Sequence, residues 1–214
     1  MKHCLARTLF TVVLAAAAVA ILDGCAALFL GGALVGGALV VTDRRTSGTM
    51  VDDEAIELKG ASRLREALGD RGGVSVTSYN RVVLLTGEVT DAADKATAEQ
   101  VVGRVDNVKS VVNELSIGFA RSVVSRSKDA FTTSKVKASF IDAKDLFANS
   151  IKVVTANQVV YLMGRVTERE AARAADVARG VEGVQKVIRV FEIISETDLA
   201  NTVPKPAPPT PPRP

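Results

Sequence analysis

Residues 79–90 read YNRVVLLTGEVT, and residues 156–167 read ANQVVYLMGRVT. Seven of these twelve positions are identical at a constant offset of 77 residues. Residues 105–112 and 181–188 share the spacing V-x-x-V-x-x-V at an offset of 76. A period longer than a solenoid unit predicts two copies of one small domain. Each copy has about 75 residues, near the lower limit for a stable core, which leaves little room for a buried catalytic site.

Both copies contain the same order of predicted elements. In the first copy we expect a helix over 52–68, strands over 74–77 and 82–89, a helix over 91–104 capped by Thr90, and a strand over 108–117. In the second copy the same elements are expected over 129–144, 151–155, 159–166, 168–179 and 184–194, with a capping box at Thr167 to Glu170. The predicted fold class is α+β: two tandem α-β-β-α-β domains, each a three-stranded mixed sheet with two helices on one face.

The N-terminus has the features of a secretory signal over residues 1–24. Lys2 and Arg7 precede an apolar stretch, and small residues follow it. The ending Leu22-Asp-Gly-Cys25 resembles the bacterial lipobox, although Asp23 stands where a small or uncharged residue is usual. The resemblance implies that Cys25 carries acyl chains, including one on its amine, and becomes the N-terminus of the mature protein.

Residues 25–46 are then expected to be the lipidated Cys25 followed by an apolar Gly/Ala/Val tether, and several acyl chains give stable anchoring. The alternative is an uncleaved membrane anchor, because residues 26–41 are also apolar. That stretch is short for a spanning helix, which needs about 20 residues.

Cysteine and histidine usage argues against catalysis. Cys4 and His3 would be lost with the signal, and Cys25 would carry lipid. The mature chain would have no Ser-His or Cys-His nucleophile and no ordinary zinc site. The acidic runs 52–54 and 168–170 are interpreted as helix-start and solvent-facing charges. We therefore expect no enzyme, and no metal or cofactor apart from the covalent acyl chains on Cys25.

The motif V-x-L-x-G-x-V before a helix occurs at Val83–Val89 and again at Val160–Val166. Together with the V-x-x-V-x-x-V motif that follows each helix, it resembles the BON domain. Two copies behind a lipobox resemble the dual-BON-domain outer-membrane lipoproteins. That resemblance implies binding to anionic phospholipid, support of envelope integrity, and a lipid-anchored, periplasm-facing position at the outer membrane. The residue after Cys25 is Ala26, and not the Asp that is associated with retention of lipoproteins in the inner membrane. No nucleic-acid partner is expected.

The predicted organisation assigns 47–118 and 119–195 to the two BON domains and 196–214 to a Pro-rich tail. All seven prolines lie in residues 204–214, so this tail should be extended and disordered. A partner with a polyproline groove is an alternative reading of the tail. The motif glycines Gly87 and Gly164 are interpreted as structural, packing closely under the crossover helix.

Charge separates the two copies. Residues 43–118 carry 10 Lys and Arg against 13 Asp and Glu, and residues 119–194 carry 13 against 8. A cationic surface near an anionic bilayer gains about 1 kcal/mol per Lys or Arg, falling off within a Debye length. The second copy is therefore predicted to face the membrane.

Four residues of the second copy are the predicted lipid-binding site: Phe131, Lys135, Lys137 and Ile141. Helical periodicity places Phe131 about 140° from the core residue Val136, near Lys135. An exposed ring one turn before a lysine suits a membrane interface. The alternative is that Phe131 precedes the helix and packs into the core or against the first copy.

Three classes of function follow. The leading one is a lipid-binding lipoprotein that supports the envelope. The second is an adaptor whose domains dock on another envelope protein, with lipid only as the anchor. The third is a structural role in a ring-forming, secretin-like assembly.

Overall fold

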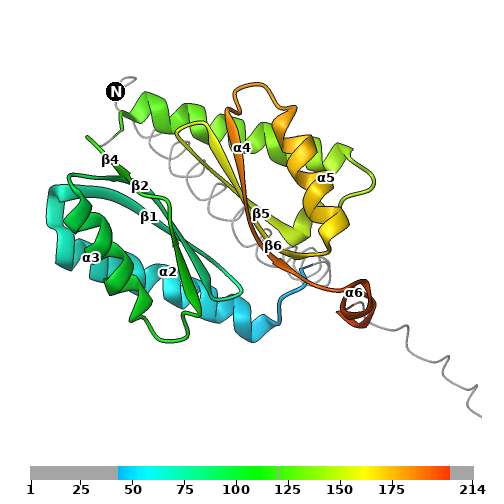
Figure 1. Cartoon of the computed structure of the whole chain (residues 1–214), viewed down its shortest axis with the longest axis horizontal. Helices are drawn as coiled ribbons and strands as arrows, with labels where there is room; N and C mark the ends of the chain where they lie inside the picture. The colour runs from blue at the N-terminus through cyan, green and yellow to red at the C-terminus, as the bar shows by residue number, and fades with distance from the viewer. Residues whose placement is uncertain (1–42, 120, 203–214) are drawn as a thin grey trace, which may run out of the picture. The chain divides into compact units, whose positions relative to one another are not determined.

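The computed structural model describes residues 43–119 and 121–202 (Figure 1). The predicted signal, Cys25, most of the predicted tether and the prolines at 204–214 lie outside the described residues. The chain falls into two units, Met1–Val41 and Thr42–Pro214, and the second contains both copies of the repeat.

The first domain is built on the central strand β2. Its elements are α2 (Ser47–Leu68), β1 (Gly72–Tyr79), β2 (Val82–Val89), α3 (Ala92–Gly103), β3 (Ser110–Asn113) and β4 (Ser116–Ile117). β1 pairs with β2 antiparallel over its whole length. β3 and β4 pair with β2 in parallel, one after the other, so the predicted third strand is present but interrupted.

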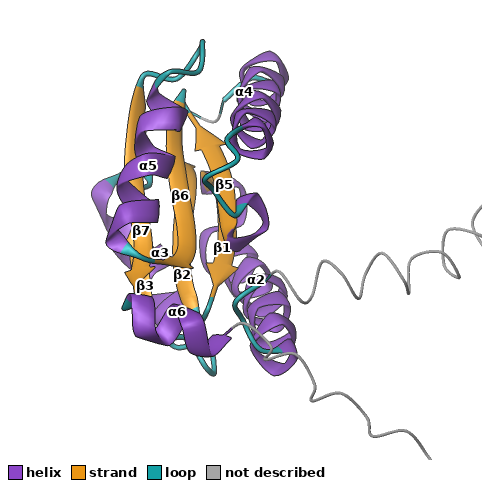
Figure 2. Ribbon diagram, turned by 90° about the vertical axis from the view of Figure 1, so that its right-hand side faces the viewer, coloured by secondary structure: helices purple, strands orange, loops and turns teal. Residues whose placement is uncertain are grey.

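The second domain repeats this plan without the interruption. Its elements are α4 (Val123–Asp142), β5 (Ile151–Ala156), β6 (Val159–Val166), α5 (Glu168–Arg179) and β7 (Lys186–Ile193), followed by α6 (Glu196–Thr202). The sheet has the order β5-β6-β7, antiparallel and then parallel. Figure 2 shows α4 and α5 beside this sheet. The predicted α+β fold class is confirmed.

Alternate residues of the central strands point to two different cores. In β6, Val160 and Leu162 pack against the helices of their own domain. Tyr161 and Met163 face the other way, into a third cluster that also contains Tyr79 and other residues of the first domain. Each sheet is therefore covered by helices on one face and joins a shared apolar cluster on the other.

Helices α2 and α4 both begin earlier than the sequence analysis expected. Thr46 caps α2 by accepting a hydrogen bond from the Thr49 backbone, and Ser122 caps α4 in the same way from Ser125. These polar caps start each helix five or six residues before the predicted position. The predicted cap Thr90 is wrong by one residue, since the Asp91 side chain caps α3.

Two short segments belong to the folded unit and not to its extensions. Residues 43–46, assigned to the tether, precede α2 and make ion pairs with the folded domains. Residues 196–202, assigned to the tail, form α6, in which Ser195 and Asp198 exchange hydrogen bonds at the first turn. The prediction of the tail rested on the seven prolines of residues 204–214, and all of these follow α6 in the sequence.

The capping box of α5 gives a first testable expectation. Thr167 accepts a hydrogen bond from the Glu170 backbone, and the Glu170 side chain accepts one from the Thr167 backbone. Thr167→Ala removes one half of this exchange and should lower the free energy of unfolding by about 1 kcal/mol. Urea unfolding followed by circular dichroism measures the change. Thr97→Ala, at a half-buried position inside α3 where the hydroxyl donates to the Ala93 carbonyl of the same helix, should show no loss, because alanine has the higher helix propensity.

Candidate functional site

Helix α4 has one buried face and one exposed apolar face. Asp129, Val136 and Phe140 are among its buried residues. On the opposite side, Val124 is 65% exposed and Phe131 is 63% exposed. Seven residues correspond to nearly two helical turns, so these two side chains lie one above the other. The helix therefore presents an apolar stripe to solvent.

The four predicted site residues all lie on the solvent side of α4. Phe131 is inside the helix and does not pack into the core. The Lys135 Nζ lies 5.0 Å from the centroid of the Phe131 ring, a cation–π arrangement. Lys137 is exposed and Ile141 is 72% exposed, both on one flank of the stripe. The structure thus brings Phe131 and Lys135 into contact and places Lys137 and Ile141 beside them.

Cations border the apolar stripe on both sides. At about 100° per residue, Lys128 and Lys135 fall on one side of Phe131, and Arg126 and Lys137 fall on the other. Lys135 is paired with Glu182 at 3.0 Å. Within the part of the chain that the structure describes, no ion pair engages the other three cations. The surface therefore combines apolar side chains with unpaired positive charge.

Three exposed apolar residues of this surface were missed by sequence reasoning. Val123 and Val124 precede residue 129, where the helix was expected to begin. Phe119, between β4 and α4, is 98% exposed. The seven-residue spacing from Val124 to Phe131 was the signal that could have revealed the longer stripe.

A buried carboxylate fixes α4 against its own sheet. Asp129 accepts hydrogen bonds from the backbone of Asn157 and Gln158, at 3.1 and 3.0 Å, and forms an ion pair with Arg121. Asn157 and Gln158 make the tight turn between β5 and β6, with φ values of 52° and 61°. One aspartate thus ties the helix and the turn to Arg121 of the interdomain linker, which is the segment between Ile117 and Val123.

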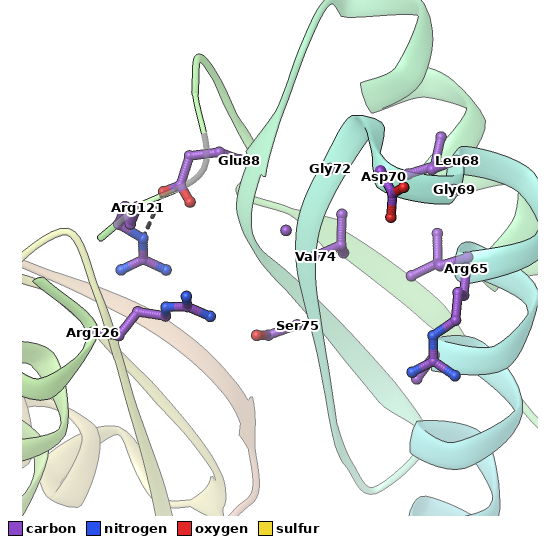
Figure 3. A pocket seen from close by; sticks show the side chains of 13 residues that line it. Arg65, Leu68, Gly69, Asp70, Gly72, Val74, Ser75, Glu88, Arg121 and Arg126 are labelled. Atoms are coloured by element: carbon purple, nitrogen blue, oxygen red, sulfur yellow. Dashed lines mark ion pairs between the residues drawn. The ribbon is translucent and has the colours of Figure 1, made fainter. Parts of the chain in front are cut away.

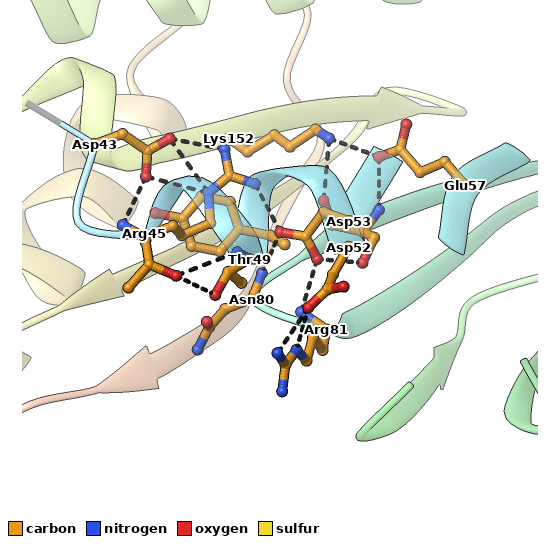
Figure 4. A network of polar contacts seen from close by, with 12 residues as sticks. Asp43, Arg45, Thr49, Asp52, Asp53, Glu57, Asn80, Arg81 and Lys152 are labelled. Atoms are coloured by element: carbon orange, nitrogen blue, oxygen red, sulfur yellow. Dashed lines mark hydrogen bonds and ion pairs between the residues drawn. The ribbon is translucent and has the colours of Figure 1, made fainter. Parts of the chain in front are cut away.

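The first domain repeats this arrangement at Asp53 (Figure 4). Its carboxylate accepts hydrogen bonds from the backbone of Asn80 and Arg81, both at 2.8 Å, and from the Ser78 hydroxyl at 2.7 Å. Arg45 forms the ion pair at 2.8 Å. Burial would raise the pKa of Asp53, but these hydrogen bonds outweigh it and hold the pKa below its usual value.

The arginines that precede α2 contact both domains. Arg45 pairs with Asp53 of the first domain and lies over the Tyr79 ring. Arg44 pairs with Glu170 of the second domain through two hydrogen bonds of 2.7 Å. Asp53 and Glu170 are buried, so the interpretation of their acidic runs as solvent-facing charges is wrong for these two residues. The reason is that each carboxylate has an arginine partner from the segment that precedes α2.

A separate hollow of about 450 Å³ lies between α2, the start of β1 and the linker (Figure 3). Arg121 is held there by Glu88 at 2.7 Å. Arg65, Arg126 and Asp70 also line the hollow. Because its lining carries both signs of charge, this hollow does not favour an anionic over a cationic ligand.

Among the described residues, no group of three or more His, Cys, Asp or Glu side chains is placed to hold a metal ion. No helix in the described ranges has both the length and the apolar character needed to cross a bilayer.

Comparison with known proteins identifies similar chains. The family model described as "BON domain" matches residues 52–118 and 128–195. The outer membrane lipoprotein DolP of Haemophilus influenzae is 39% identical over 176 residues, covering 81% of this chain and 90% of that protein. The 21 kDa hemolysin of Actinobacillus pleuropneumoniae is 32% identical over 154 residues, covering 71% and 79%. The osmotically-inducible protein Y of Escherichia coli is 32% identical over 148 residues, covering 65% and 72%.

Solved structures add little to this. The C-terminal domain of CdsD, a structural protein of the type III secretion system of Chlamydia trachomatis, aligns at 14% identity with a TM-score of 0.27, covering 67% of each chain. A likeness this weak carries no argument about fold or assembly.

Proposed function

We propose that this chain binds anionic phospholipid through its second domain. The premise is its family: the chain belongs to the BON-domain family and, within it, to the two-domain outer membrane lipoproteins of the DolP type. Its role would be non-enzymatic support of envelope integrity. The binding surface is the solvent-facing side of α4.

The observation that carries this proposal is the apolar stripe of α4 between two rows of cations. Val124, Phe131 and Ile141 are exposed along the helix. A helix with apolar side chains on one face and Lys or Arg at its borders lies in the plane of a membrane interface. The apolar side chains enter the acyl boundary, while the long cationic side chains reach the phosphates.

The length of α4 sets the size of the contact. Its 20 residues span about 30 Å, enough to touch several lipids along the membrane surface. The buried Asp129 network holds the helix against its sheet, so the stripe is presented without any rearrangement of the domain. The second domain would therefore dock as a rigid body.

Substituting the exposed ring tests this function. The chain from residue 43 onward, without its lipid anchor, should sediment with phosphatidylglycerol vesicles and not with phosphatidylcholine vesicles. Phe131→Glu should weaken this binding at least tenfold, on the order of 1.4 kcal/mol, because it replaces an inserted ring with a charge that phosphate repels. The measurement is co-sedimentation over a lipid titration at low salt, repeated at high salt, where binding should fall.

A matched control is available in the first domain. Leu58 on α2 is 66% exposed, much like Phe131. Leu58→Glu should leave vesicle binding unchanged. Equal loss in both variants, or equal binding to neutral vesicles, would contradict recognition by α4. Absence of binding to both vesicle types would favour the adaptor function, with the acyl chains alone providing attachment.

A further inference from the structure

Strand β7 forms one edge of the sheet of the second domain (Figure 2). β6 pairs with it on one side, and no strand among the described residues pairs with it on the other. Its eight residues extend over about 26 Å. An edge of this length presents a row of backbone donors and acceptors with which another strand can pair.

The equivalent edge of the first domain is interrupted. β3 has only four residues, and residues 114 and 115 separate it from the two residues of β4. On the opposite edge of that sheet, side chains occupy the backbone of Ser78 in β1. Its N–H donates to Glu57 at 2.7 Å, and its carbonyl accepts from Lys152 at 3.1 Å. Short strands and covering contacts keep a sheet edge from pairing with another chain, whereas β7 is long and continuous.

β7 also carries apolar side chains that its own domain covers only in part. Ile193 is 50% exposed, and four more apolar residues of the strand are half-buried: Val187, Ile188, Val190 and Phe191. The neighbouring strand β6 is almost wholly buried. A strand added to this edge would therefore bury apolar surface as well as pair backbone groups.

A hollow flanks each face of β7. Between the two sheets, a hollow of about 410 Å³ is lined by Val112 of the first domain and by Ile188 and Val190. On the α5 side, a hollow of about 170 Å³ is lined by Phe191 and Ile193. Because successive side chains of a strand point to opposite faces, a strand beside β7 would place its side chains alternately in these two hollows.

The hydrogen bonds to β6 determine which residues of β7 offer free backbone groups. The Ile194 N–H donates to the Val166 carbonyl at 3.0 Å, and Val166 is in register with Ile193. Backbone groups alternate in direction along a strand, so the N–H groups of residues 188, 190 and 192 point toward β6. The backbone groups of residues 187, 189, 191 and 193 therefore point outward along the open edge.

One antiparallel register lets β7 pair with β7 of a second copy without opposing like charges. A two-fold axis at Arg189 would place this residue opposite its own copy, which is unfavourable. An axis at Val190 instead places Arg189 opposite Phe191. It also places Val187 opposite Ile193 and Val190 opposite its own copy. Outward-pointing residues then face outward-pointing residues, as antiparallel pairing requires.

The charges of β7 are complementary in this register. Lys186 of one copy lies diagonally across from Glu192 of the other, at both ends of the paired strands and within reach of a long side chain. Arg189 lies opposite an aromatic ring, which attracts a cation. Within its own copy Arg189 is held by an exposed ion pair of 3.3 Å with Glu168, so it can turn toward this ring at small cost.

We propose that β7 is an interface between two copies of this chain, which pair their β7 strands antiparallel about a two-fold axis at Val190. The pairing joins the two three-stranded sheets into one continuous sheet. Because such an axis is perpendicular to the sheet, the helix-covered face stays on the same side in both copies. The exposed stripes of both α4 helices can therefore contact one membrane, although the pairing itself does not depend on lipid binding.

The concentration dependence of the molecular mass tests this association. The chain from residue 43 onward contains every described helix and strand and both helix-covered cores, so it is the protein to use. One pair of strands makes a small interface, and the dimer should be weak in solution. Sedimentation equilibrium should show the apparent mass rising from one chain toward two between about 10 µM and about 1 mM. The mass of one chain throughout this range would overturn the proposal.

Arg189→Pro tests pairing through the backbone. The Arg189 N–H points away from β6, so proline removes a hydrogen bond between the copies and none within the sheet. The dissociation constant should rise by at least about tenfold relative to Arg189→Ala, which removes the same side chain but keeps the N–H. Circular dichroism checks that both variants fold. Equal dissociation constants in the two variants would contradict strand pairing at this edge.

A disulfide reports the register. Both cysteines of the chain, Cys4 and Cys25, precede residue 43, so Val190→Cys introduces the only thiol. In the proposed register the two thiols face each other across Cα atoms about 4.5 Å apart, within disulfide range. Under mild oxidation Val190→Cys should form a covalent dimer faster than Lys186→Cys, because the exposed residues 186 lie at opposite ends of the paired strands. Equal or faster cross-linking of Lys186→Cys would indicate random collision and overturn the proposal.

Discussion

Arg44→Ala should lower the free energy of unfolding of the chain from residue 43 onward by about 3–5 kcal/mol. The side chains of Arg44 and Glu170 are 7% and 2% exposed, and two hydrogen bonds of 2.7 Å join them. Removing the arginine leaves a buried carboxylate without its cationic partner. Because Arg44 precedes the first domain and Glu170 belongs to the second, both should lose stability together.

The pH dependence of this loss has a definite sign. Burial would raise the pKa of Glu170, but the hydrogen bonds from Arg44 and from the Thr167 backbone outweigh it and lower the pKa in the folded state. The contribution of Glu170 is therefore present above its unfolded-state pKa and is lost as pH falls through the lower folded pKa. In Arg44→Ala, burial instead favours protonation, so the difference between the two proteins should shrink as pH falls from 7 toward 4.

Urea unfolding at several pH values, followed by circular dichroism, measures this difference. Arg189→Ala is the control, since its ion pair with Glu168 is exposed and 3.3 Å long. It should change stability by less than about 1 kcal/mol. A similar small change for Arg44→Ala would show that Arg44 does not hold the domains together.

Gly87→Ala should destabilise the first domain by about 3 kcal/mol or more. Gly87 has φ +120°, which L side chains rarely adopt, and an added Cβ would lie 2.0 Å from the Gly73 carbonyl oxygen of β1. The same approach recurs in the second domain, where a Cβ on Gly164 would lie 2.5 Å from the Ser150 carbonyl oxygen. Gly87 thus lies against the backbone of β1, and Gly164 lies against the backbone of the residue directly before β5. The sequence analysis had expected close packing under the crossover helix instead.

The matched control is Gly103→Ala at the end of α3. There a Cβ would meet only Val111, at 3.9 Å, an ordinary van der Waals distance. This change should be neutral or slightly stabilising, because alanine favours the helix. Thermal unfolding of both variants compares the two positions directly. A mild effect at Gly87 would mean that the strand can shift to accept the methyl group.

The sequence repeat predicted most of the fold. Strands β2 and β6 occur where the duplicated motif predicted them, and the Thr167–Glu170 capping box is present. The sequence analysis did not predict which faces of the two domains meet. Both central strands are almost wholly buried, and a continuous apolar run does not say what covers each face.

The site was predictable where helical periodicity applies. The angular position of Phe131 relative to Val136 indicated its exposure, and the structure places it on the solvent side. Asp53 and Asp129 could not be recognised as buried, because their partners are the backbone of a distant turn and an arginine before the helix. Such long-range partners leave no local pattern in the sequence.

The central claim, that α4 inserts into an anionic membrane, can be tested by fluorescence. The chain contains no tryptophan, so Phe131→Trp provides a single reporter at the predicted point of contact. With the chain from residue 43 onward, the tryptophan emission should shift to shorter wavelength with phosphatidylglycerol vesicles and remain unchanged with phosphatidylcholine vesicles. Unchanged emission with phosphatidylglycerol, under conditions where the protein sediments with those vesicles, would contradict the account by placing membrane contact elsewhere on the molecule.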